Sequence, residues 1–177
     1  MFEKEDKEIV ARVLEGRVED FRSIIDRYQQ VVYNLTFKLT GDHEDAKEST
    51  QRTFVKVYSN LRLYDPEYKF FSWLYRIGIN ETLSYLKSKK DHLPVEEGHF
   101  KSQENFATLE DQGEKERVIR KSIKRLKYDY RVLIVLKYYE NLSYEEISSV
   151  TSVPVKKVRS RLFTARQILK DDLTNLL

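Results

Sequence analysis

The sequence predicts an all-α protein made of two small helical domains joined by a flexible acidic linker, the C-terminal domain carrying a helix-turn-helix. Apolar residues recur at spacings of three and four in both halves of the chain, as on one face of a helix. Residues 91–113 show no such period, contain one proline and two glycines, and hold one Lys or Arg against six Asp or Glu. The flanks, 1–90 and 114–177, each have room for a small domain.

Four helices are predicted in residues 1–90. A short one stops at Gly16, and a long one, Phe21 to Leu39, ends at Gly41, since glycine favours helix C-termini. Asp42 to Leu61 forms the third, with acidic residues in its first turn where the helix dipole favours negative charge. Pro66 interrupts the pattern. The fourth helix has an apolar stripe of Phe71, Leu74, Tyr75, Gly78, Ile79, Thr82, Leu83 and Leu86.

Two further helices are predicted before the helix-turn-helix. The first contains Val118, Ile119, Ile123 and Leu126, and the second covers Arg131 to Tyr139. The run VLIVLKYY inside the second also fits a buried strand, because short apolar runs do not distinguish the two. Helical patterns lie on both sides and no partner strand is evident, so a helix is the better interpretation.

Leu142 to Lys170 has the pattern of a helix, a three-residue turn and a second, basic helix. Ser143 and Glu146 have the spacing of a capping box, which fixes where the first helix begins. A charged solvated face is common on any amphipathic helix. The capping box, the short turn and the absence of acidic residues from Ile147 to Lys170 together favour a helix-turn-helix that reads the DNA major groove.

The second of these helices separates an apolar face from a polar one. Its inward face comprises Val155, Val158, Leu162, Ala165 and Leu169. Its other faces carry Lys156, Lys157, Arg159, Ser160, Arg161, Thr164, Arg166, Gln167 and Lys170. Long cations suit phosphates and guanine edges, while hydroxyl and amide groups donate to and accept from base edges.

Composition agrees with a DNA-binding protein. The formal net charge is +3, but residues 114–177 hold 15 Lys or Arg against 8 Asp or Glu, whereas residues 1–90 are nearly balanced at 16 against 15. The chain has no cysteine, which excludes disulfides and thiolate metal sites. The charged N-terminus does not resemble a secretory signal, and the longest apolar run, Val132 to Leu136, is far below the roughly 20 residues of a membrane span. A cytoplasmic protein without direct membrane insertion is expected.

Seven aromatic residues crowd the segment from Tyr58 to Tyr75, interleaved with cations. Unstacked bases stack on aromatic rings while cations hold the backbone, so this composition is typical of single-strand binding. A small packed core is the alternative, and it fits Phe71 and Tyr75. It fits less well for three residues that lie near Pro66 or off the inward stripe, namely Tyr64, Tyr68 and Trp73.

Three stretches carry a resemblance to a known family: DHEDAKESTQRTFVKVY (42–58), FFSWLYRIGINETLSYLKSKK (70–90) and LSYEEISSVTSVPVKKVRSRLFTAR (142–166). In this order they resemble the extracytoplasmic function (ECF) group of bacterial RNA polymerase sigma factors, in the sigma-70 family. The resemblance implies a promoter-specificity subunit that binds core RNA polymerase, recognises −35 and −10 elements and promotes promoter opening. It implies no enzymatic activity, no cofactor and no metal, and a chain that is monomeric when free. Many relatives are controlled by an anti-sigma factor, which is the further partner the resemblance suggests.

The resemblance also assigns roles to positions. Residues 1–90 match the domain that binds core polymerase and the −10 element, and residues 114–177 match the domain that binds the −35 element. The implied core polymerase contacts are Asp45, Glu48, Gln51, Phe54 and Tyr58. The implied −10 contacts are Arg62, Tyr64, Asp65, Tyr68 and Lys69 in a base-capturing loop, then Trp73, Arg76, Asn80, Ser84 and Lys87 along a helix. The implied −35 contacts are Lys156, Lys157, Arg159, Ser160, Arg161, Thr164 and Arg166.

The chain departs from the family pattern at several of these places. The family often has an acidic residue at the position of Arg52 and an apolar residue near Ser49. It often has aspartate at the position of Ser84. Lys156 and Lys157 replace a common Gly-Thr pair, which suggests stronger phosphate anchoring or a different −35 preference.

Two other classes of protein are the alternatives to this interpretation. A stand-alone helix-turn-helix regulator explains residues 114–177 equally well, but it leaves the aromatic-basic segment unexplained and predicts a dimer on palindromic half-sites. An enzyme has little support, because the chain offers three histidines, no glycine-rich phosphate loop and no zinc-ligand spacing.

Overall fold

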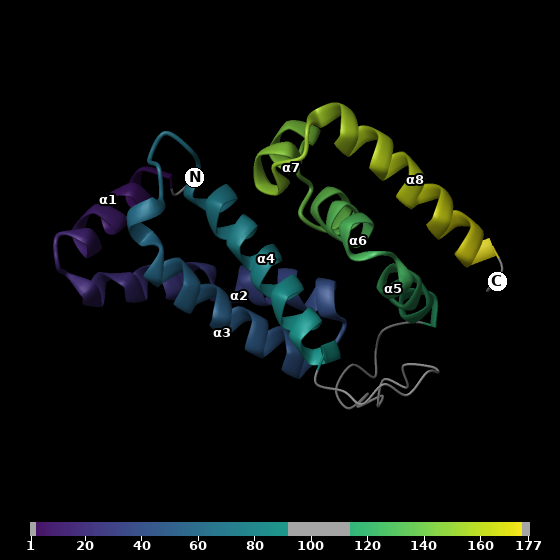
Figure 1. Ribbon diagram of the computed structural model, residues 1–177, viewed down its shortest axis with the longest axis horizontal. Helices are drawn as coiled ribbons and strands as arrows, with labels where there is room; N and C mark the ends of the chain where they lie inside the picture. Colours follow the sequence, from purple (N-terminus) through teal and green to yellow (C-terminus); the bar gives the residue numbers. More distant parts are fainter. Residues whose placement is uncertain (1–2, 92–113, 175–177) are drawn as a thin grey trace.

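The computed structural model describes residues 3–91 and 114–174, and Figure 1 shows them as two helical units. Every regular element in these ranges is helical, which confirms the all-α prediction. Apart from Asp91, the last residue of a helix, the predicted linker lies outside the described residues.

The first unit contains the four predicted helices and two short 3-10 turns. Its elements are α1 (Glu3–Leu14), η1 (Val18–Asp20), α2 (Phe21–Thr40), α3 (His43–Ser59), η2 (Leu61–Leu63) and α4 (Phe70–Asp91). The junction between α2 and α3 follows the sequence signals. Gly41 adopts a left-handed conformation, with φ of 68°, and donates its N–H to the carbonyl of Phe37. The next residue, Asp42, accepts a hydrogen bond from the N–H of Asp45, at 3.0 Å, and so begins α3.

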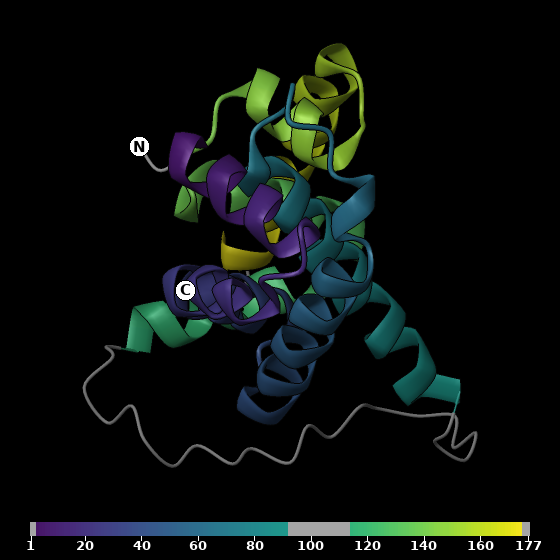
Figure 2. The same cartoon turned by 90° about the vertical axis from the view of Figure 1, so that its left-hand side faces the viewer.

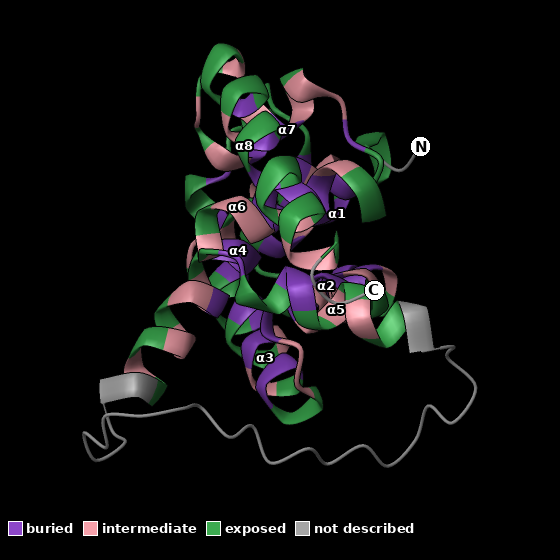
Figure 3. Cartoon of the chain, turned by 90° about the vertical axis from the view of Figure 1, so that its right-hand side faces the viewer, coloured by how far each residue is buried: buried purple, intermediate pink, exposed green. Residues whose placement is uncertain are grey.

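The core of the first unit is apolar and aromatic. Its buried members are Ile9, Val10, Val13, Phe21, Ile24, Tyr28, Val32, Phe54, Val57, Leu61, Tyr64, Phe70 and Leu74. They come from all four helices and from the chain between α3 and α4, and Figure 3 shows the buried stripes of these helices in purple. One polar group joins them: Asp6 accepts from the hydroxyl of Tyr28, at 2.6 Å, and pairs with Arg27. This buried carboxylate therefore ties α1 to α2.

The second unit is built around the helix-turn-helix. Its elements are α5 (Glu114–Arg125), α6 (Tyr128–Ile134), the π-helical turn η3 (Val135–Tyr139), α7 (Tyr144–Thr151) and α8 (Val155–Thr174). The ambiguous run VLIVLKYY is helical, with Val132 to Leu136 all buried. Ser152 takes the left-handed conformation, with φ of 57°, in the turn between α7 and α8.

The predicted capping box at the start of α7 is confirmed. Ser143 Oγ accepts from the N–H of Glu146, at 3.1 Å, and the Glu146 carboxylate accepts from the N–H of Ser143, at 2.9 Å. The hydrogen bond from the backbone N–H of Ser143 is the main reason that the pKa of Glu146 is lowered. Charged Glu146 therefore stabilises the folded helix start.

Replacing Glu146 with alanine is expected to lower the free energy of unfolding at pH 7 by about 1 kcal/mol, the usual effect of losing a helix cap. Because the folded pKa is lowered, this stabilisation is present above the ordinary value of 4.5 and is lost as the pH falls through the folded value. Urea unfolding at pH 7 and at decreasing pH checks this. Glu145→Ala, at the exposed neighbour, is the matched control, and an equal effect of both variants at pH 7 would contradict the cap.

The two units pack against each other through a common core. Buried residues of α2 and α4, including Leu35, Leu39, Tyr75 and Ile79, join the buried cluster of the second unit. In Figure 1, α6 lies between α4 and α8, and Figures 1 and 2 show α7 near the start of α4. The sequence suggested two separate domains, whereas the structure shows two helical units with a shared apolar interface. This interface brings α7 against two of the predicted site residues, Lys69 and Arg76.

Candidate nucleic-acid interface

The recognition helix α8 presents the polar face that the periodicity predicts. Val158, Leu162 and Ala165 are buried against the rest of the second unit. The cations and small polar groups on the other side are exposed, namely Lys156, Lys157, Arg159, Ser160, Thr164, Arg166 and Gln167, and Arg161 is half-buried. All of the predicted −35 residues therefore belong to one helix, with only Arg161 turned partly inward.

The cations of α8 differ in how they are held. Arg159 lies 3.8 Å from Glu145 and over the ring of Tyr144, and Arg161 lies 3.7 Å from Asp129. Lys156 and Lys157 form no ion pair with any described residue, and they stand in the first turn of the helix. These two lysines are therefore available to phosphates without breaking an existing interaction.

The structure adds Phe163 to this surface. Its side chain is 58% exposed, and it is one residue beyond the buried Leu162, on the flank that carries Arg159 and Arg166. An exposed aromatic side chain on a recognition helix can contact the methyl group of thymine. A helical wheel of α8 already places Phe163 about 100° from the buried Leu162, and so off the inward face.

A second polar stripe runs along α4. Arg76, Asn80, Ser84 and Lys87 are exposed at spacings of four, four and three, and Trp73 begins the stripe as a half-buried side chain. Trp73 packs its ring near Tyr64 and Phe70, at centroid distances of 5.4 and 5.7 Å. The predicted −10 residues of this helix thus share one face.

The N-terminal end of the α4 stripe contacts the second unit. The guanidinium of Arg76 donates to the carbonyls of Val150, at 3.2 Å, and Ser149, at the C-terminal end of α7. Lys69 Nζ lies 3.6 Å from Glu146 at the other end of the same helix. Two of the predicted −10 cations therefore contact α7.

The loop between η2 and α4 gives a mixed result. Arg62, Asp65, Tyr68 and Lys69 are exposed, and Tyr68 is 64% exposed. Tyr64 is only 7% exposed, its ring meets Phe70 edge-on at 5.2 Å, and its hydroxyl donates to the carbonyl of Tyr68, at 2.7 Å. The packed-core alternative, which fitted Tyr64 less well in the sequence, therefore holds for this residue. This burial raises the pKa of Tyr64 to about 12.

The predicted polymerase-contact helix also needs two corrections. Phe54 is buried in the core of the first unit, and its neighbour Val55 is the exposed apolar residue, at 61%. Asp45 is buried too, and its carboxylate accepts from the Tyr85 hydroxyl, at 2.9 Å, and from Lys89, at 2.6 Å. Both side chains support the fold and have little surface for a partner.

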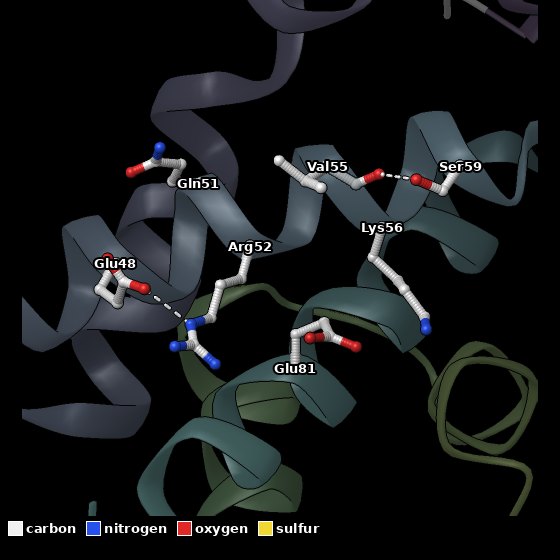
Figure 4. A pocket seen from close by; sticks show the side chains of 7 residues that line it. All are labelled: Glu48, Gln51, Arg52, Val55, Lys56, Ser59 and Glu81. Carbon is white, nitrogen blue, oxygen red and sulfur yellow. Dashed lines mark hydrogen bonds and ion pairs between the residues drawn. The ribbon is translucent and has the colours of Figure 1, made fainter. Parts of the chain in front are cut away.

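An open groove of about 330 Å³ lies between α3 and α4 (Figure 4). Its lining residues are Glu48, Gln51, Arg52, Val55, Lys56, Ser59 and Glu81. Arg52, the departure from the family pattern, donates to Glu48 at 2.7 Å and places its guanidinium 5.1 Å from the centre of the Tyr85 ring. The reversed charge is therefore partly satisfied within the chain. Gln51 and Tyr58 are exposed and Glu48 is half-buried.

This arrangement defines a helical protein with a duplex-reading helix in one unit and an aromatic-basic face in the other, the class to which DNA-binding transcription factors belong. Comparison with known proteins narrows the class. Residues 24–92 match the family model of sigma-70 region 2, and residues 116–169 match that of sigma-70 region 4.

Full-length relatives agree with these matches. The chain is 30% identical to the ECF RNA polymerase sigma-E factor of Haemophilus influenzae, with 97% of each protein covered. It is 30% identical to the RNA polymerase sigma-H factor of Pseudomonas aeruginosa, and the match covers 99% of this chain and 97% of that protein. It is 29% identical to the ECF RNA polymerase sigma factor SigW of Bacillus subtilis, and the match covers 96% of this chain and 97% of that protein. The chain belongs to the ECF group of the sigma-70 family and is an RNA polymerase sigma subunit for promoter recognition and transcription initiation.

Solved structures show the same fold. CnrH in complex with the cytosolic domain of CnrY has a TM-score of 0.69 at 22% identity, covering 96% of this chain and 97% of CnrH. RpoE of Bartonella quintana, solved with the anti-sigma factor NepR, has a TM-score of 0.65 at 21% identity, covering 88% and 98%. Within residues 3–91 and 114–174, no helix is both long and apolar enough to cross a membrane.

Proposed function

We propose that the sigma activity is divided among three surfaces. The exposed part of α3 and the groove beside it bind core polymerase, the loop and polar stripe of α4 bind unstacked −10 bases, and α8 reads the −35 duplex. Residues 1–90 and 114–177 form the two functional domains. The protein acts in the cytoplasm without catalysing a reaction, is monomeric when free, and has an anti-sigma factor among its partners.

The observation that carries this proposal is that one chain contains both a helix-turn-helix with an exposed basic face and a second face that is aromatic and basic. A helix-turn-helix with an exposed basic face accounts for duplex recognition. The α4 stripe with its flanking aromatic and basic loop supplies what a single strand requires. Stacking of unpaired bases is worth about 1 to 3 kcal/mol each, which offsets the few kcal/mol needed to flip a base. A stand-alone regulator has no need of the second surface.

The polymerase-docking surface is tested by Val55→Glu, because Phe54→Ala would disturb the core. A charge in the middle of this exposed patch is expected to weaken binding to bacterial core RNA polymerase about thirtyfold, the effect of losing an interface hot spot. Fluorescence anisotropy of the labelled full chain, titrated with core enzyme, measures it. Gln29→Glu on the exposed face of α2 is the control. Equal affinities for Val55→Glu and wild type would place docking elsewhere, and no binding by the folded wild type would overturn the proposal.

A further inference from the structure

Glu140 occupies a special position between the two units. It ends η3, its side chain is only 13% exposed, and both of its carboxylate oxygens bind the first unit. One accepts from Lys38 Nζ of α2 and the other from the hydroxyl of Tyr75 of α4, each at 2.9 Å. Tyr75 is fully buried in the shared core. One residue of the second unit thus connects two helices of the first.

Other polar contacts cross the same interface. The Arg131 guanidinium donates to the carbonyl of Leu39, and the Tyr128 hydroxyl donates to the carbonyl of Ile79, at 2.7 Å. Arg76 donates from α4 to the carbonyl end of α7. The interface is therefore both apolar and specifically hydrogen-bonded, and buried groups that lose such partners are costly to leave unpaired.

The closed arrangement conflicts with simultaneous reading of two promoter elements. Positions −35 and −10 are separated by about 25 base pairs, or about 85 Å of B-DNA at about 3.4 Å per pair. A compact chain of 177 residues has a radius of gyration of about 16 Å and is about 40 Å across. In addition, Arg76 and Lys69 of the proposed −10 surface already contact α7. The units must separate before both elements can be bound.

Separation is compatible with the length of the chain between the units. Residues 92–113 number 22, and a chain of this length spans at most about 75 Å. Added to the size of the units themselves, this reach accommodates the promoter spacing. Closing and opening can therefore be two states of one intact chain.

We infer that Glu140 is an intramolecular latch, which holds the free sigma factor closed by binding Lys38 and Tyr75 and so limits access of single-stranded DNA to the Arg76 end of α4. The inference rests on the proposed function for the identity of the DNA surface. The latch itself is a property of the interface. Opening releases Arg76 and Lys69 from α7 together, because the charged ends of both side chains contact it in the closed chain.

The latch is tested by measuring the distance between the two units. The chain lacks cysteine, so spin labels can be placed at Ser23→Cys on α2 and Thr174→Cys on α8, both exposed. The parent is expected to give one narrow distance distribution, and Glu140→Ala an additional population at longer distances than the parent's. Tyr75→Phe, which keeps the ring and removes only the donated hydrogen bond, should shift the distribution in the same direction by less. Asp26→Ala, which removes an exposed carboxylate paired within α2, should leave it unchanged.

Binding provides the second readout. The same full-length variants, without spin labels, are titrated against a fluorescein-labelled, random-sequence strand of about 20 nucleotides, long enough for sequence-tolerant stacking. Glu140→Ala is expected to bind about tenfold more tightly than wild type, a typical coupling between two sites. Circular dichroism establishes whether each variant is folded. If Glu140→Ala does not fold, strand binding by Tyr75→Phe tests the latch in its place.

The possible outcomes distinguish failure of the latch from failure of the proposed function. A broad distance distribution in the parent, or no change in Glu140→Ala, would overturn the latch. Opening without tighter strand binding would overturn its control of the DNA surface. If the wild type fails to bind core polymerase while Glu140→Ala still opens the chain, the proposed function fails and the latch remains.

Discussion

Tyr64→Ala is expected to lower the free energy of unfolding of the first unit by about 3 to 5 kcal/mol, the range found for removing a large buried aromatic side chain. The ring is nearly buried and packs between Phe70 and Trp73, so its loss leaves a cavity at the point where the loop returns to α4. The hydroxyl also caps the loop through the carbonyl of Tyr68. Urea unfolding followed by circular dichroism measures the change.

Two substitutions separate packing from other effects. Tyr64→Phe removes only the hydroxyl and should cost about 1 kcal/mol. Tyr68→Ala removes a ring that is mostly exposed and should change stability by no more than about 0.5 kcal/mol. A Tyr64→Ala protein that unfolds like wild type but no longer binds single strands would restore the base-stacking role that the resemblance suggested.

Replacing Lys156 and Lys157 together with alanine is expected to reduce the slope of log K against log salt concentration for duplex DNA by about 2, since each phosphate contact contributes about 0.9. At 0.15 M salt this corresponds to about a thirtyfold loss of affinity. Both lysines are exposed in the first turn of α8 and unpaired among the described residues, so their charges are available to phosphates. A salt series with the full chain and random-sequence duplex measures the slope.

A matched pair of lysines lies on the other unit. Lys4→Ala with Lys7→Ala changes the net charge equally, but it lies on α1, away from the recognition helix. This control should leave the salt slope nearly unchanged. Equal slopes for the two double variants would show that general charge, rather than the position of Lys156 and Lys157, governs duplex binding.

Local signals in the sequence determined the helices and their ends. Gly41, Asp42 and the Ser143–Glu146 pair act through backbone groups a few residues away, so their effect does not depend on the rest of the fold. The inward face of α8 follows equally from its 3.6-residue period. The polar −35 face was predictable for the same reason.

The sequence was less informative about side chains whose burial depends on helices far away along the chain. Tyr64 flanks a proline and appears loop-like in sequence, yet its ring completes a core formed by residues from distant helices. Phe54 and Asp45 share a helix with residues of the docking groove, and only the positions of α2 and α4 show that they face inward. Side-chain burial at such positions depends on long-range packing, which periodicity along one element does not contain.

The sequence by itself thus determined the all-α class, the order of the helices, the starts of α3 and α7, the helix-turn-helix and the resemblance to the family. Only the tertiary structure decided which aromatic side chains are core, that Val55 rather than Phe54 is exposed on α3, and that Glu140 joins the second unit to Lys38 and Tyr75. The reason is physical. Helix formation and capping depend on groups close along the chain, whereas burial and the contacts between units depend on residues brought together from up to 102 positions apart.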